Sequence, residues 1–196
     1  MKKKAIVAVV AFVLVLCCAI GGTLAWLVDS TSEVKNTFTY GDINIDLSEN
    51  TGSEYKMIPG NDITKDPKVT VEAESEACWL FVKVKESDNF DDFMTYAIAE
   101  GWTELSGVTG VYYREVDATT AKAGASYQVL AGKDGYQDGY VTVNDEVTKE
   151  MLNALDKNAD GSDKTEKTYP TLTFTAYAVQ KDGFDTAALA WAEINK

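Results

Sequence analysis

The sequence of 196 residues has no histidine. A Ser-His-Asp triad, a Cys-His pair and an HExxH zinc site all need that side chain, so these catalytic classes are excluded. Paired carboxylates could still carry acid–base chemistry, but no pair stands out among the 31 aspartates and glutamates. The chain also has no glycine-rich loop of the phosphate-binding kind. We therefore expect a protein that is not an enzyme.

Cysteine is equally scarce. The chain has three cysteines, and two of them, Cys17 and Cys18, lie in an apolar segment near the N-terminus. Once that segment is removed, Cys78 stands alone and no intramolecular disulfide can form. Cys78 lies in the apolar run 77–82, which indicates a buried structural thiol. Packing must therefore supply the stability of the fold.

Positive charge is also in short supply. The chain has 18 lysines and arginines against 31 acidic residues, which gives a net charge of −13. Nucleic acids and anionic membranes bind basic protein faces, so we expect neither as a partner. An acidic surface keeps a secreted protein soluble and attracts cations.

The N-terminus has the order of a secretory signal. Lysines at positions 2–4 precede an apolar run over 5–20, and Thr23-Leu24-Ala25 has the pattern of an A-x-A peptidase site. We place cleavage between Ala25 and Trp26. Loss of the three lysines lowers the net charge from −13 to −16. Residues 1–25 are then a signal peptide, and residues 26–196 form one ordinary domain.

Two other interpretations of this segment remain. The apolar length from Ala5 to Val28 is sufficient for a retained membrane anchor, which needs about 20 residues. A lipoprotein would carry its lipid on Cys17 or Cys18, but Leu16 and Cys17 are bulky where that motif needs a small residue. The protein would then contact a membrane only through this segment.

Short alternating apolar segments dominate the mature chain. In the segment 78–85, Leu80, Val82 and Val84 share one face, which should lie toward the core, while Lys83 and Lys85 should reach water. Seven or eight strands with glycine-rich turns and three prolines favour a mainly β fold, an antiparallel sandwich with a jelly-roll-like strand order. The expected strands cover 38–47, 68–72, 78–85, 111–116, 126–130, 140–143 and 171–180.

Two or three short helices should accompany the strands. Apolar residues at helical spacing predict a helix over 90–100. A second helix is expected over 148–155, with Thr148 as its N-cap, and a third over 185–194, with Asp185 as its cap. The segment 55–66 has a Pro59-Gly60 turn signal and is expected to be a loop.

One loop has part of a calcium-binding motif. The pattern D-x-N-x-D-G-x places oxygen-bearing side chains at alternate positions, and glycine permits the sharp turn. The candidate ligands are Asp156, Asn158, Asp160 and Ser162. The twelfth position of the motif needs an acidic residue, but Lys167 stands there and Glu166 comes one place early. An acidic surface loop without metal explains the same residues, so calcium is one of two interpretations.

Two N-terminal motifs resemble a known family. The segment 21–29, Gly-Gly-Thr-Leu-Ala-Trp-Leu-Val-Asp, resembles signals cleaved by the SipW-type signal peptidase of Gram-positive bacteria. The pattern Asn36-Thr37-Phe38-x-x-Gly41-x-Ile43-x-Ile45-x-Leu47 resembles the first strand of the TasA/camelysin family of biofilm matrix proteins. Further similarities lie at 58–62, 80–84 and 174–180, whereas 101–168 matches only loosely.

The resemblance implies a jelly-roll subunit that is secreted to the extracellular matrix or cell surface and assembles into fibres. It implies that the segment 26–38 adds as a strand to a neighbouring copy or a related matrix subunit. The apolar residues Trp26, Leu27 and Val28 fit this role, because they are costly to leave in water. Head-to-tail contacts of this kind do not close, so they produce filaments. A flexible leader is the alternative, since residues 29–33 are polar.

Two other functions compete with the fibre subunit. A monomeric cell-surface adhesin, dependent on calcium or not, could bind a ligand through Tyr112, Tyr113, Tyr136 and Tyr140. Camelysin relatives have also been described as metallopeptidases. Without histidine, a catalytic zinc here would need carboxylates or Cys78 as ligands, which gives the peptidase little support.

Overall fold

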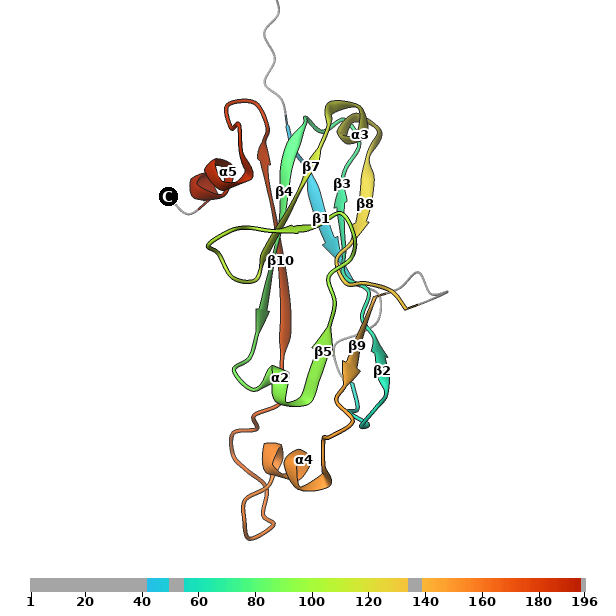
Figure 1. Cartoon of the computed structure of the whole chain (residues 1–196), viewed down its shortest axis with the longest axis vertical. Helices are drawn as coiled ribbons and strands as arrows, with labels where there is room; N and C mark the ends of the chain where they lie inside the picture. The colour runs from blue at the N-terminus through green and yellow to red at the C-terminus, as the bar shows by residue number, and fades with distance from the viewer. Residues whose placement is uncertain (1–41, 50–54, 134–138, 195–196) are drawn as a thin grey trace, which may run out of the picture. The chain divides into compact units, whose positions relative to one another are not determined.

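The computed structural model describes residues 42–49, 55–133 and 139–194, all within one compact unit, Tyr40–Lys196 (Figure 1). The fold is mainly β, with antiparallel sheets, as the sequence predicts. The strands are β1 (Ile45–Ser48), β2 (Asp62–Thr64), β3 (Lys68–Val71), β4 (Cys78–Glu86), β5 (Met94–Tyr96), β6 (Thr103–Glu104), β7 (Val111–Val116), β8 (Ala125–Gln128), β9 (Tyr140–Val143) and β10 (Leu172–Gln180). The helices are α2 (Phe90–Phe93), α3 (Ala118–Ala123), α4 (Lys149–Asp156) and α5 (Ala187–Ile194).

The strands form two layers. One layer is the four-stranded sheet β10-β4-β7-β6. The other contains the sheets β1-β3-β8 and β2-β9-β5. The amide of Ala99 donates to Val129 (3.0 Å) and that of Val129 to Pro67 (2.9 Å), so hydrogen bonds link these two sheets side by side. In the described part of the chain, no helix has the length and apolarity needed to cross a membrane.

The core lies between the two layers, against β4. Leu80 and Val82 of β4 are fully buried and pack with Val69 and Val71 of β3. Face-to-face packing of this kind is the arrangement of a β-sandwich. Chain segments cross between the layers from β3 to β4, β4 to β5, β5 to β6, β7 to β8 and β9 to β10. A jelly-roll-like order stays a prediction.

Helix α5 covers the outer face of the four-stranded sheet (Figure 1). The ring of Phe81 lies 5.2 Å from that of Trp191, centroid to centroid, and Trp79 is buried in the same cluster. Lys83 and Lys85 follow on this face and are exposed, as the alternation predicts. The strand β4 is therefore apolar on both faces over its first half and on one face over its second half.

The prediction of a helix over 90–100 is wrong beyond the first helical turn. Helix α2 ends at Phe93, and Met94–Tyr96 forms β5, which pairs with β9. Phe90, Phe93 and Met94 are all buried, which satisfies the apolar spacing without a continuous helix. Long-range pairing with β9 outweighs a local pattern that fits both structures.

Several local predictions hold and three need correction. Thr148 caps α4, since its Oγ1 accepts from the amide of Met151 (3.2 Å). The segment 55–66 has the predicted turn but also contains β2. The cap of α5 comes from Thr186, which accepts from the amide of Leu189 (3.3 Å), and not from Asp185. Helix α3 was not expected, so the described residues contain four helices in place of two or three.

Candidate functional site

The residues predicted to drive polymerisation and processing lie outside the described residues. This applies to Ala25, Trp26, Leu27 and Val28, and to the whole donor segment 26–38. The fold can therefore inform only the receiving side of a strand-addition contact. Such a contact needs a sheet edge with unpaired backbone groups and apolar sites that alternate along it.

One such edge exists where β1 lies beside β10. Both strands are the outermost members of their sheets. Their core-facing side chains are all apolar, yet each is only half-buried, whereas the equivalent residues of β3 and β4 are buried. We call this strip the β1–β10 seam, and it consists of Ile43, Ile45, Leu47, Leu172, Phe174, Ala176 and Ala178. The core is incompletely covered along this line.

The backbone of β10 presents hydrogen-bonding groups toward the seam. The amide of Ser87 donates to Thr171 (3.0 Å) and that of Lys181 donates to Ala77 (2.8 Å). In an antiparallel pair, every second residue forms its backbone hydrogen bonds with the same neighbouring strand. The amides and carbonyls of the odd-numbered residues of β10 therefore point toward β4. The even-numbered residues then direct their amides and carbonyls outward. In the described ranges, no strand pairs with that outer edge.

The backbone of β1 has the same property. The amide of Glu72 donates to the carbonyl of Asn44 (2.8 Å), so the even-numbered residues of β1 face β3. Ile43, Ile45 and Leu47 then direct their backbone groups away from β3. On both strands, the residues whose backbone faces outward also carry the half-buried apolar side chains.

The two ends of the seam differ. At one end, where β1 begins and β10 ends, the amide of Glu76 donates to Asp42 (3.0 Å) and the neighbouring Ala77 accepts from Lys181. At the other end, β1 is followed by Glu49, which accepts from Lys65 (2.7 Å) and from the hydroxyl of Tyr55 (3.3 Å). The side chains of Lys65 and Tyr55 line a cavity that also reaches Leu172, the first residue of β10. We call this the α4 cavity.

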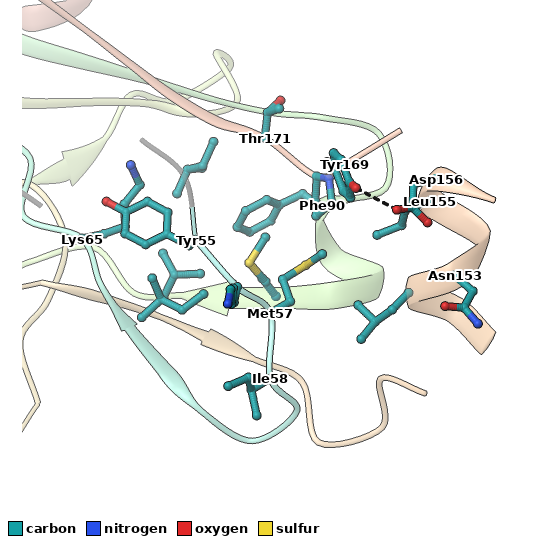
Figure 2. A pocket seen from close by; sticks show the side chains of 17 residues that line it. Tyr55, Met57, Ile58, Lys65, Phe90, Asn153, Leu155, Asp156, Tyr169 and Thr171 are labelled. Carbon is teal, nitrogen blue, oxygen red and sulfur yellow. Dashed lines mark hydrogen bonds between the residues drawn. The ribbon is translucent and has the colours of Figure 1, made fainter. Parts of the chain in front are cut away.

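The α4 cavity has a volume of about 860 Å³ and is mostly apolar (Figure 2). Its apolar lining includes Met57, Ile58, Phe90, Met94, Leu152 and Leu172. Three large hydrophobic side chains are strongly exposed in the described part of the chain: Ile58 (51%), Tyr169 (46%) and Leu189 (56%). Two of the three, Ile58 and Tyr169, line this cavity. Apolar surface gathered in a hollow is typical of a binding site.

Polar groups at the cavity have internal partners. The hydroxyl of Tyr169 donates to the carboxylate of Asp156 (3.1 Å), and that bond is the main cause of a raised pKa at Tyr169. Lys65 is paired with Glu49 and also lies over the ring of Tyr55. The cavity therefore offers apolar contacts beside these internally paired polar groups.

The predicted calcium loop follows α4. Ser162 donates to the Asp160 carboxylate from its amide (2.9 Å) and its hydroxyl (2.6 Å), and Asn158 donates to the Ser162 hydroxyl (2.9 Å). Asp156 bonds to Tyr169, away from this set. Among the described residues, no three His, Cys, Asp or Glu side chains are grouped to hold a metal ion. The four candidate oxygen ligands include two carboxylates, and calcium binding stays a prediction.

Further titratable groups lie at a second cavity and in the core. The lining of this second cavity, which has a volume of about 690 Å³, includes four carboxylates and two threonine hydroxyls: Asp91, Asp92, Asp145, Glu146, Thr95 and Thr142. Burial raises the pKa of the Cys78 thiol to about 11, so this cysteine is inert and structural.

The tyrosines considered for an adhesin do not converge on one loop. Tyr112 and Tyr113 are neighbours on β7, so their side chains point to opposite faces of the sheet. Tyr140 opens β9 in the other layer, and Tyr136 lies outside the described residues.

Sequence reasoning identified β10 as a strand but missed the α4 cavity and the seam. The apolar alternation of β10 was visible, but its position at a sheet edge depends on pairing across the whole domain. The cavity joins Met57, Phe90, Leu152 and Tyr169, which are far apart in the chain. No protein-family model matches this sequence, and no curated protein matches it.

Proposed function

We propose that this chain is a secreted structural subunit of extracellular biofilm matrix fibres. After a SipW-type peptidase removes residues 1–25, the segment 26–38 of one subunit adds as a strand to the next. The partner is a second copy of the chain or a related matrix subunit. The β1–β10 seam is the observation that carries the proposal, because it combines a half-buried apolar strip with a sheet edge that no strand of the described residues pairs with.

The physical reason for strand addition is the state of that edge. An edge strand with unpaired amides and carbonyls is a template for another strand, and natural proteins usually shield it with charges, prolines or bulges. Strand β10 has nine residues, and none of them is charged or proline. A strand laid along β10 would pair the outward backbone groups and cover Phe174, Ala176 and Ala178.

The two sides of the contact lie on one chain, so the contact can repeat. Residues 39–44 separate the donor segment from β1, and the receiving edge lies along β1 and β10. A donor that joins the next subunit leaves the seam of its own subunit available to a third. Such a heterologous contact extends as a filament when the rotation between subunits does not close a ring.

Electron microscopy of purified protein tests this function. Residues 26–196 are compared with a chain that keeps residues 20–25 before Trp26. We expect fibres from the first protein and none from the second, because the extra residues extend the donor beyond the seam. Monomers from both proteins would overturn the homopolymer and favour the monomeric adhesin. Fibres from both would show that the new N-terminus is not needed.

A further inference from the structure

The position of the donor within a fibre follows from the two ends of the seam. The described chain begins at Asp42, close to the start of β1 and the end of β10, so the donor segment is joined to its own subunit at this end. The α4 cavity lies at the opposite end, since Leu172, the first residue of β10, lines it. We place the leaving end of each subunit against the cavity end of the next, an arrangement that a repeated head-to-tail contact permits. The C-terminal residues of the donor segment then lie nearest the α4 cavity of the next subunit.

The sequence of the donor segment has a matching alternation. All its strongly apolar residues except Leu27 stand at even positions. The residues at the even positions are Trp26, Val28, Ser30, Ser32, Val34, Asn36 and Phe38. Its odd positions carry every charge, at Asp29, Glu33 and Lys35. In a strand these two sets point to opposite faces, so the even set would face the core and the odd set would face water.

One antiparallel register along β10 places Phe38 at the cavity. A donor that enters at the cavity end runs antiparallel to β10, so with Trp26 opposite Gln180, residue 34 lies opposite Leu172. Phe38 then lies opposite residue 168, next to Tyr169, which lines the cavity. This register pairs even donor residues with the even residues of β10, whose side chains face the core. The compact unit begins at Tyr40, so Phe38 is the first apolar residue outside it.

We propose that Phe38 of one subunit occupies the α4 cavity of the next subunit and anchors the added strand. The inference rests on the proposed strand addition and names its anchor. Aromatic side chains bury large apolar areas and dominate interface energies. This cavity offers Met57 and Phe90 as contacts (Figure 2), and Met94 also lines it. Flexible methionine side chains can adapt to an inserted ring.

Cysteine crosslinking in fibres tests the anchor. The mature chain has only the buried Cys78 as background. Phe38→Cys is combined either with Ile58→Cys or with Leu152→Cys, on two different parts of the cavity wall. Each variant is assembled in an equal mixture with unsubstituted protein and mildly oxidised. We expect covalent dimers and higher multimers on a non-reducing gel for at least one combination, since a disulfide needs Cα atoms within about 7 Å.

The controls separate this inference from the function on which it rests. Phe38→Cys with Leu189→Cys, on the exposed face of α5, should give no multimers. Fibres that form without crosslinks to Ile58 or Leu152 would overturn the anchor and leave strand addition intact. Crosslinks from Trp26→Cys to the same cavity residues would show that the donor runs in the opposite direction. Absence of fibres from unsubstituted protein would instead overturn the proposed function.

A truncation supplies a second readout that does not need a disulfide. Phe38→Ala should raise the critical concentration for assembly by roughly tenfold or more, because a buried aromatic anchor is lost. Thr37→Ala is the matched control, since residue 37 belongs to the odd set that faces water. Equal effects of the two substitutions, or none from Phe38→Ala, would contradict the anchor.

Discussion

Proline substitutions at adjacent positions of β10 should separate assembly from folding. The amide of Ala176 faces outward to the seam, whereas that of Thr175 faces β4. Proline has no amide hydrogen and is tolerated in sheets only where that group is not used by a neighbouring strand. Ala176→Pro should therefore block strand addition, and Thr175→Pro should damage the monomer.

The magnitude follows from the hydrogen bond that is lost. A proline at 176 leaves one carbonyl of the added strand without a partner, which costs about 1–3 kcal/mol. A free-energy change of 1.4 kcal/mol is a factor of ten, so the critical concentration for Ala176→Pro should rise roughly 5- to 150-fold. The pairing of β10 with β4 is spared, so the free energy of unfolding of the monomer should change much less than in Thr175→Pro.

Two assays measure these quantities on the same samples. Sedimentation of fibres gives the critical concentration, and urea unfolding followed by tryptophan fluorescence gives the free energy of unfolding. We expect Ala176→Pro to affect mainly the first and Thr175→Pro mainly the second. Assembly of Ala176→Pro at the normal critical concentration, from a folded monomer, would refute strand addition along β10.

Three further predictions concern the subunit itself. Gly110 has φ +72° and a Cβ there would lie 2.6 Å from the backbone carbonyl oxygen of Val84, whereas Gly107 has φ +80° and open space, so Gly110→Ala should lower the free energy of unfolding by about 1–3 kcal/mol more than Gly107→Ala in urea titrations. Equal losses would contradict this packing. The pKa of Cys78 is about 11 when folded against an ordinary 9.0, so the unfolded thiol ionises first and stability should fall as pH rises from 9 to 11. Cys78→Ala should remove that part of the slope, and an unchanged slope would refute it. Thr148→Ala should cost about 1 kcal/mol by loss of the α4 cap, and Thr148→Ser should restore most of it in thermal unfolding.

Local sequence patterns predict the long strands well because their side chains alternate over many residues. Strands β4 and β10 each have nine residues, and the patterns at 78–85 and 171–180 locate both. The helix predicted over 90–100 fails because Phe90, Phe93 and Met94 fit a helix and a turn followed by a strand equally well. Only the distant partner β9 decides between these structures.

The candidate site is harder to predict than the fold, because it is defined by a strand edge and a cavity that other parts of the domain leave uncovered. The residues of β10 look like those of any half-buried strand, and nothing local indicates that its outer edge is open. The α4 cavity brings Met57 and Phe90 together with Tyr169 from a distant loop. In contrast, the resemblance of the N-terminal motifs to a known family implies the donor segment, and its apolar start after a cleavage motif fits that role.

Amide hydrogen exchange along β10, measured in the monomer and in the fibre, tests the central claim most directly. In the monomer, the outward amides of Phe174, Ala176 and Ala178 should exchange quickly, while those of Thr175 and Tyr177 should be protected by β4. In fibres, the three outward amides should become protected, because an added strand accepts from them. Fibres in which these three amides still exchange as fast as in the monomer would contradict strand addition at the β1–β10 seam.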